Sequence, residues 1–317
     1  MSMTLLEFCT IALQDCGFEV PSGIIGNSDE TAIRTIAAAQ LAGKSLQKAA
    51  PGGWVANIRE YDFTTAAVPQ QAGTIANTGP NGTAVISGLS GISAVSQNTW
   101  YAFGSGLPNN SIVTATTSST VTVNQVATTT GAGQYVFGQS DYALPSDFHR
   151  PIDDTLWDRS RFWSLRGPMS PQQWQLYKSS VIGRASIQRR FRFRFVGGIT
   201  VFSVDPVPTD NGSPLVFEYV SNAWCQSSTG VPQTLWQADT DTTILDDDLM
   251  MLGVRWRVKR GLGFAYNEEL DEYERELRKA MSLDGGAAIL NMTPSNHLTL
   301  IGPWNIPESG FGGVVGG

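Results

Sequence analysis

The chain has 317 residues, more than a single hydrophobic core usually holds, so two domains are the first expectation. Its formal net charge of -7 argues against broad affinity for nucleic acids or anionic membranes, because phosphate binding needs concentrated positive charge. The three cysteines have no motif spacing, and we interpret them as buried thiols of a protein from a reducing compartment: Cys9, Cys16 and Cys225.

The first part of the chain is predicted to be helical. Its first residues lack a basic leader and a long apolar core, so we expect neither a signal peptide nor a membrane anchor. Apolar residues recur at helical spacing over residues 4–16, and a second helix follows, with Ser28 as its predicted N-cap. The predicted buried face of this second helix consists of Ile33, Ile36, Ala37, Leu41 and Leu46. Residues 60–64 then alternate like a strand, and we assign residues 1–72 to the first part of a host domain.

A long uncharged segment follows. From Phe63 to Ser140 the chain contains no Lys, Arg, Asp, Glu or His. Residues 112–117 and 120–124 alternate with period two around two serines, which is typical of a tight hairpin. Because Thr and Val favour pleated, half-buried surfaces, we expect residues 73–138 to form an inserted all-β domain, a sandwich or a barrel. Low charge with many Ser, Thr and Gly residues also describes disordered linkers, but the regular alternation favours folding.

Charged and aromatic residues return in residues 139–282, which we assign to the second part of the host domain. Pro171 predicts the first turn of a helix, and residues 188–195, 200–204 and 215–220 alternate like strands of an antiparallel sheet. Acidic residues at Asp246–Asp248 open a long helix, as the helix dipole favours.

A further amphipathic helix follows, on which we expect i,i+4 ion pairs between Asp271 and Arg275 and between Glu274 and Arg278. Residues 283–317 then contain few charges, many glycines and scattered large apolar side chains, so we predict an extended arm that docks onto a partner. The apolar residues expected to dock are Ile289, Leu290, Leu298, Ile301, Trp304, Ile306 and Phe311.

The sequence offers little support for a catalytic motif. The two histidines, His149 and His297, belong to no recognised motif, and we expect no cofactor and no metal site. Residues 239–243 superficially match the DxDxT motif of aspartyl-phosphate hydrolases, but a weak strand precedes them, so turn and capping roles explain them better. We therefore predict that the protein is not an enzyme.

One strand carries an unusual row of basic residues. Arg190, Arg192 and Arg194 share one face of the strand at 188–195 and form a ridge about 13 Å long. The ridge either pairs with acidic residues of the same or a neighbouring subunit, or faces DNA in a channel or an acidic partner. The negative net charge argues against DNA as a tight ligand.

Several segments together resemble the head-to-tail adaptor proteins of tailed bacteriophages, also called head completion or tail tubular proteins. The resemblance rests on the order of seven segments: TLLEFCTIALQDCGF, ETAIRTIAAAQLAGKSLQKAAPGGW, REYDFTT, YALPSDFHRPIDDTLWDRS, GPMSPQQWQLYKSS, FEYVSNAW and LDDDLMMLGVRWRVKRGLGFAYNEELDEYERELRKA. In that family the third segment passes almost directly into the fourth, whereas here the uncharged segment separates them.

The resemblance implies an α+β fold, with a helical bundle packed on an antiparallel β element, the inserted all-β domain and the extended C-terminal arm. It implies a structural virion protein at the head-tail junction, assembled in the host cytoplasm. Twelve copies would form a ring between the portal and the tail tube or nozzle, and DNA would pass through the channel without specific binding. Residues 283–317 would bind the portal protein, and the inserted domain would carry tail fibres or spikes.

A receptor-binding or carbohydrate-binding virion module on a helical stalk is the alternative. In that reading, exposed Trp100 and Tyr101 of the inserted domain would stack on sugars or contact a fibre or receptor.

Overall fold

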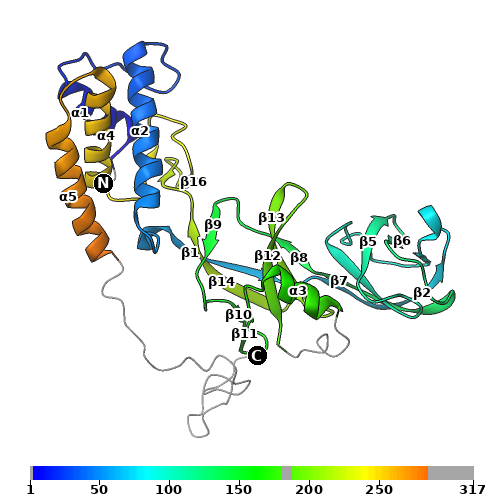
Figure 1. The fold of residues 1–317 in the computed structure, drawn as a ribbon. Helices are drawn as coiled ribbons and strands as arrows, with labels where there is room; N and C mark the ends of the chain where they lie inside the picture. The colour runs from blue at the N-terminus through cyan, green and yellow to red at the C-terminus, as the bar shows by residue number, and fades with distance from the viewer. Residues whose placement is uncertain (1–2, 180–187, 285–317) are drawn as a thin grey trace, which may run out of the picture. The chain divides into compact units, whose positions relative to one another are not determined.

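The computed structural model describes residues 3–179 and 188–284 of the chain (Figure 1). Within these residues the chain forms two compact units. The first consists of residues 3–60, 146–152 and 218–284, and the second of residues 61–145, 153–179 and 188–217. None of the helices in this part of the chain combines the length and the hydropathy of a membrane-spanning segment.

Four α-helices belong to the first unit, together with one 3-10 helix and three short paired strands. The helices are α1 (Leu5–Gln14), α2 (Glu30–Ala49), η1 (Val55–Asn57), α4 (Asp247–Leu262) and α5 (Asn267–Leu283). The paired strands are β15 (Cys225–Gln226), β16 (Pro232–Gln233) and β17 (Thr242–Thr243), in the order β16-β15-β17. Helix α4 packs against α1, α2 and α5.

Side-chain caps fix where the helices begin. Thr4 and Glu7 form a capping box on α1, because the Thr4 hydroxyl accepts from the Glu7 N–H at 3.3 Å and the Glu7 carboxylate accepts from the Thr4 N–H at 2.7 Å. The N-cap of α2 is Asp29, so the prediction of Ser28 is wrong by one residue. The Asp246 carboxylate accepts from the Leu249 N–H at 2.9 Å and caps α4, as its acidic start predicted.

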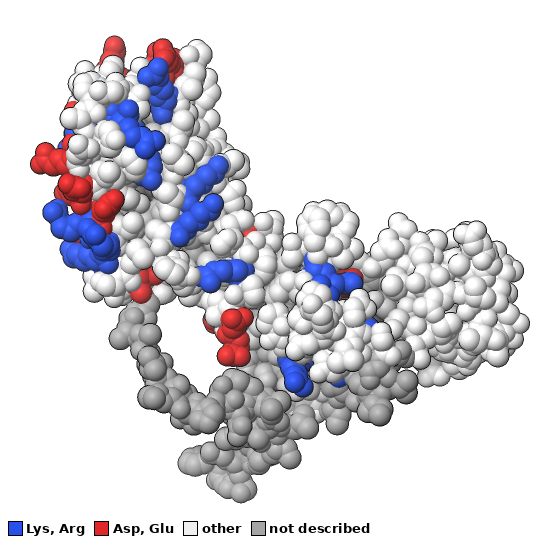
Figure 2. All heavy atoms as spheres, viewed as in Figure 1, with Lys and Arg blue, Asp and Glu red and all other residues white. Residues whose placement is uncertain are grey.

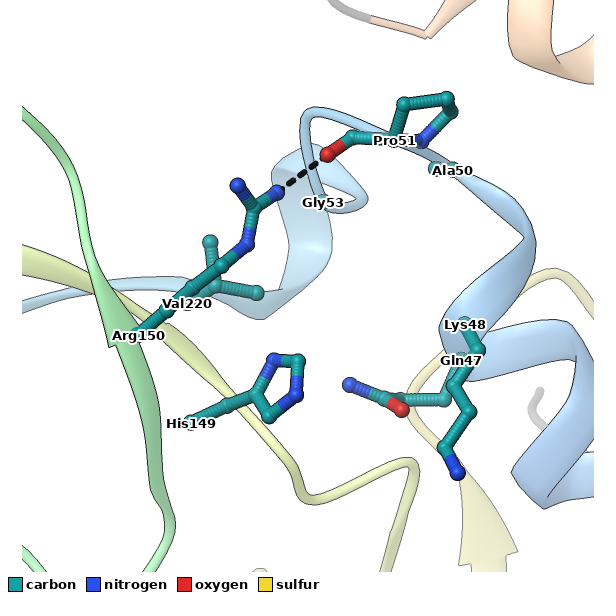
Figure 3. A pocket seen from close by; sticks show the side chains of 8 residues that line it. All are labelled: Gln47, Lys48, Ala50, Pro51, Gly53, His149, Arg150 and Val220. Atoms are coloured by element: carbon teal, nitrogen blue, oxygen red, sulfur yellow. Dashed lines mark hydrogen bonds between the residues drawn. The ribbon is translucent and has the colours of Figure 1, made fainter.

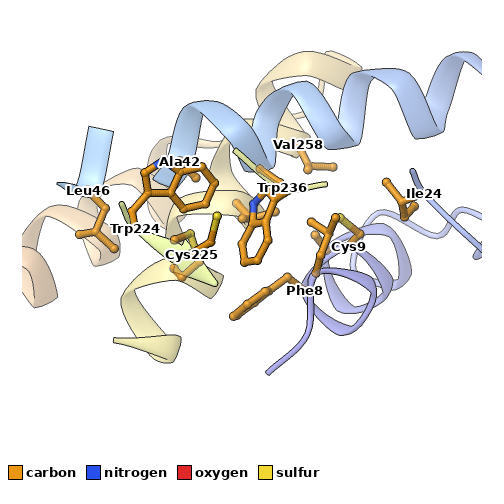
Figure 4. Packing of buried hydrophobic residues seen from close by; sticks show 14 of the residues in the cluster. Phe8, Cys9, Ile24, Ala42, Leu46, Trp224, Cys225, Trp236 and Val258 are labelled. Atoms are coloured by element: carbon orange, nitrogen blue, oxygen red, sulfur yellow. The ribbon is translucent and has the colours of Figure 1, made fainter. Parts of the chain in front are cut away.

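The core of the first unit closes around two tryptophans (Figure 4). The ring centroids of Trp224 and Trp236 lie 5.0 Å apart with nearly perpendicular planes, and the Trp224 Nε1–H donates to the Thr234 carbonyl at 2.8 Å. Gly43 of α2 faces the Trp224 ring so closely that a Cβ there would lie 2.2 Å from the ring carbon Cε3. Small residues on α2 therefore let the helix approach the indole.

The second unit contains a closed six-stranded barrel made by the uncharged segment. Its strands follow the order β2-β3-β6-β5-β4-β7, and η2 (Pro80–Gly82) lies between β2 and β3. They are β2 (Ala67–Ala76), β3 (Val85–Ser87), β4 (Trp100–Gly104), β5 (Ser111–Thr116), β6 (Val121–Val123) and β7 (Gly131–Gln139). β5 and β6 pair as the predicted hairpin. The predicted limits of the inserted domain, 73–138, stay a prediction.

A three-stranded sheet and helix α3 (Pro171–Ser179) lie in the same unit as the barrel. The sheet has the order β12-β13-β8, from β12 (Arg190–Val196), β13 (Ile199–Asp205) and β8 (Asp141–Ala143). Lys178 of α3 lies 2.9 Å from the Asp205 carboxylate and 4.8 Å from the centroid of the Tyr101 ring of the barrel. The Asn110 side chain donates to the Lys178 carbonyl at 3.0 Å, so a barrel loop also holds the end of α3.

The remaining sheet has five strands, with the order β1-β14-β10-β11 and β9 paired to β14. Its members are β1 (Ile58–Thr64), β9 (Phe148–Pro151), β10 (Trp157–Asp158), β11 (Trp163–Ser164) and β14 (Pro214–Ser221).

The expected fold class, a helical bundle on an antiparallel β element, is wrong. The described residues contain five α-helices but seventeen strands, and α3 is the one α-helix in the described part of the second unit. The physical reason is strand length. β10, β11, β15, β16 and β17 have two residues each, too few to show an alternating pattern, and β10 also pairs with the distant strand β14.

Candidate functional site

The outer face of α2 combines exposed apolar side chains with exposed lysines. Its residues recur every three or four positions and are all exposed: Ile33, Ala37, Leu41, Lys44 and Lys48. Ile33 is 52% exposed and Leu41 is 49% exposed, although both were predicted to be buried. We call these five residues the α2 outer face. The prediction was right only for Leu46, which is 1% exposed, and for Ile36, which is half-buried.

The buried side of α2 explains this reversal. Towards the core the helix presents mostly small residues, among them Ala39, Ala42 and Gly43, which pack against α4 and Trp224. Large apolar side chains would not fit at such a short separation, so they lie on the opposite side. Lys44 and Lys48 continue the same row, and this spacing is the signal that the sequence prediction overlooked.

A basic pocket adjoins the C-terminal end of this face (Figure 3). It has a volume of about 230 Å³ and contains no Asp or Glu. Its lining residues are Gln47, Lys48, Ala50, Pro51, Gly53, His149, Arg150 and Val220, all of which belong to the first unit. The Arg150 guanidinium donates to the Pro51 carbonyl, and the side chains of His149 and Gln47 both extend into the hollow.

Neighbouring acidic groups do not neutralise the pocket. Asp147, two residues before His149, lies 3.3 Å from Arg59 and accepts hydrogen bonds from the Tyr219 and Ser221 hydroxyls at 2.9 and 2.7 Å. Within residues 3–179 and 188–284, no carboxylate lies at ion-pair distance from Lys48. The pocket therefore offers Lys48, His149, Arg150 and the Gln47 amide to an anionic group from outside.

The N-terminal half of helix α5 carries the opposite charge. This half presents Glu268, Asp271, Glu272 and Glu274, none of which has an ion pair among the described residues. The expected pairs from Asp271 to Arg275 and from Glu274 to Arg278 do not form; Arg275 lies 3.8 Å from Glu276 instead. Figure 2 shows acidic side chains over the upper part of α5, basic side chains over its lower part and basic side chains along α2. We call these four acidic residues the α5 acidic face.

One acidic residue of α5 is used internally. The Glu269 carboxylate accepts from the Lys259 ammonium of α4, and this hydrogen bond lowers the pKa of Glu269 below its ordinary value.

The predicted arginine ridge lies in the second unit and is largely paired within it. Arg194 lies 2.6 Å from the Asp141 carboxylate. Arg190 lies 3.6 Å from Asp205, and its guanidinium stacks 3.8 Å from the centroid of the Tyr177 ring. Arg192 is half-buried and has no ion pair among the described residues. Whether the ridge also faces a channel or a neighbouring subunit stays a prediction.

The two aromatic residues proposed for receptor contact are inside the protein. Trp100 is 2% exposed and Tyr101 is 6% exposed, and burial raises the pKa of the Tyr101 hydroxyl above its ordinary value. Both belong to β4, where Trp100 packs in the barrel core and Lys178 covers the ring of Tyr101. Stacking on a sugar needs an exposed ring face, so these two side chains do not provide that surface.

The DxDxT-like segment has the expected turn role at Asp241, whereas Asp239 binds a distant loop and neither residue caps a helix of the described chain. The Asp239 carboxylate accepts from the N–H groups of Ile24 and Ile25, and the Asp241 carboxylate accepts from those of Gln237 and Ala238. The seven apolar residues predicted to bind the portal, from Ile289 to Phe311, lie outside the described residues.

Comparison with known protein families identifies the class of protein. The family model described as "SU10 adaptor protein" matches residues 112–296, which is more than half of the chain. The chain therefore belongs to the SU10 adaptor protein family, a family of bacteriophage adaptors. The match begins within β5 and contains α3, α4 and α5, so it includes part of the barrel as well as residues from both units. No curated protein matches the chain.

Membership of this family gives the protein a structural role as a component of a phage virion. Such a role agrees with the sequence-based expectation of a structural protein and makes no demand for a catalytic centre.

Proposed function

We propose that this protein is the head-to-tail connector of its phage, a ring-forming adaptor between the portal and the tail tube or nozzle. The observation that carries the proposal is the match of residues 112–296 to a phage adaptor family. In this function the ring continues the DNA channel, residues 283–317 bind the portal protein, and the barrel projects as a dock for fibres or spikes.

The surface of the first unit supports a role in assembly. On the α2 outer face, Ile33 and Leu41 are about half exposed. Exposed apolar surface is unfavourable in a monomer, and burial in an interface would remove it from water. The barrel suits projection from an assembly because its surface has no charges. An uncharged surface neither attracts nor repels DNA over long range.

Reconstitution with purified portal rings of the same phage tests the connector function. We expect the full chain to bind the portal and electron microscopy to show an added ring that prolongs the channel. A chain that ends at Gly285 should fold, as judged by circular dichroism, but fail to bind. Normal binding by the truncated chain would contradict the assignment of the arm, and absence of binding by the full chain would contradict the connector function.

Labelling the barrel in intact virions tests the location. A tag inserted after Ser118, in the β5–β6 turn, should appear at the head-tail junction. A tag found only at the far tips of fibres would favour a receptor-binding module instead.

A further inference from the structure

Two faces of opposite charge lie on different helices of the first unit. The α2 outer face and the basic pocket provide Lys44, Lys48 and Arg150, whereas the α5 acidic face provides Asp271 and Glu272. Helix α4 packs against both α2 and α5 and lies between them (Figure 1). The two faces therefore point away from one another and do not meet within one copy.

We propose that the α2 outer face and the basic pocket of one copy bind the α5 acidic face of a second copy. This assignment deepens the proposed function, because it names the surfaces through which neighbouring subunits of the ring would meet. Each copy carries both surfaces at different places, so the contact is head-to-tail and repeats from copy to copy, the geometry that generates rings.

The chemistry of the pocket fits a carboxylate. Lys48, His149 and Arg150 line one hollow of about 230 Å³ together with Gln47. Arg150 already donates to the Pro51 carbonyl and the Gln47 amide to the Ser221 carbonyl at 3.4 Å, so a carboxylate would use their remaining N–H groups. A Glu or Asp side chain is small enough to enter this volume, and hydrogen bonds from charged donors to a carboxylate are among the strongest in proteins. Among the exposed carboxylates of the first unit, Glu268, Asp271 and Glu274 are clustered on one helix and have no ion pair within the described residues.

The apolar parts of the two faces match as well. Along α2, Ile33 and Leu41 come before the basic residues. Before the acidic residues of α5 comes Phe264, which is 45% exposed and packs edge-on against half-exposed Phe18 at 6.1 Å between ring centroids. Apolar residues precede the charged residues along α2, and Phe264 precedes α5 in the chain. A docking arrangement that joins the opposite charges would also bring these apolar residues together.

Reciprocal charge reversal tests this contact. The first variant combines Lys44→Glu with Lys48→Glu, and the second combines Asp271→Lys with Glu272→Lys. We expect the full-length wild-type protein to self-associate at low ionic strength in sedimentation experiments, and each variant alone to associate about tenfold or more weakly, because like charges then oppose one another. An equimolar mixture of the two variants should recover the association, since each acidic α2 then meets a basic α5.

A control variant and four outcomes make the test decisive. Arg278→Glu with Lys279→Glu changes the net charge as the first variant does, but on the C-terminal half of α5, and should leave association unchanged. Wild-type protein that stays monomeric, variants that associate normally, or a mixture that does not recover would each overturn the proposal. Association that appears only after removal of residues 286–317 would also overturn it, because the chain's own segment would then be the occupant.

Portal binding, measured separately, keeps the two proposals distinguishable. Protein that self-associates in this charge-dependent way but does not bind the portal contradicts the connector function alone. Protein that binds the portal while the charge reversals have no effect contradicts only the proposed subunit contact.

Discussion

Replacing Gly43 by Ala should destabilise the first unit, although helix propensity alone predicts the opposite. In the interior of an exposed helix, Gly to Ala typically stabilises by about 1 kcal/mol. At Gly43, however, the new Cβ would lie 2.2 Å from the Trp224 ring, well inside van der Waals contact. The indole cannot move easily, because it is 1% exposed, hydrogen-bonded through Nε1 and packed edge-on against Trp236.

Overpacking of this kind usually costs about 1–3 kcal/mol, so after the gain of about 1 kcal/mol in helix propensity we expect a net loss of up to about 2 kcal/mol in the free energy of unfolding. Urea unfolding followed by far-ultraviolet circular dichroism measures it, since four of the five described α-helices belong to the first unit. Gly261 near the end of α4 is the matched control, because no atom lies within 4 Å of its Cβ position. If Gly43→Ala were as stable as Gly261→Ala, the close packing of α2 on Trp224 would be refuted.

Two further predictions concern a helix cap and the thiols. Asp246→Ala removes the cap of α4 and should lower the free energy of unfolding by about 1 kcal/mol. Asp248→Ala, in the exposed first turn, should lower it by less. Equal losses in urea unfolding would contradict the capping role of Asp246. Burial raises the pKa of Cys9 to about 12, so a thiol reagent at mildly alkaline pH should label half-buried Cys16 first. Because folding keeps the Cys9 thiol protonated, the contribution of this thiol to stability should fall as the pH rises from its ordinary pKa of 9.0 towards 12. Faster labelling of Cys9 than of Cys16 would contradict the burial of Cys9.

Local patterns in the sequence predicted the local features well. The helical spacing at residues 4–16, the acidic start at Asp246 and the alternation on both sides of Ser118 correspond to α1, α4 and the β5–β6 hairpin. Each of these features depends on contacts between residues close in sequence, such as the N-cap of α4 or the turn from Thr117 to Thr120. Interactions between residues close in sequence leave patterns that can be recognised in a single sequence.

Long-range packing decided what the sequence could not predict. The sheet β16-β15-β17 joins segments separated by several turns, and strands of two residues have no readable period. The buried side of α2 was also unpredictable from hydropathy alone, because the position of Trp224 favours Gly43 and alanines there over Ile33 and Leu41. The candidate site was missed for the same reason: the apolar residues assigned to the core lie on the outside.

The barrel shows why a foreign-looking segment can sit inside this chain. Its first and last strands, β2 and β7, pair with one another, and Ala67 lies opposite Gly138 while Val68 lies opposite Phe137. The chain thus enters and leaves the barrel on adjacent strands, which is the geometry that insertion into a host loop requires. At Gly138 the barrel packs closely against the segment that contains Pro208. A Cβ at Gly138 would lie 2.1 Å from the Pro208 carbonyl oxygen. Together with Lys178 over Tyr101, this contact means that the uncharged barrel is held against the rest of its unit by specific packing. Such a fixed position would suit the docking role proposed for the barrel, because a freely tethered barrel would lose more entropy on binding.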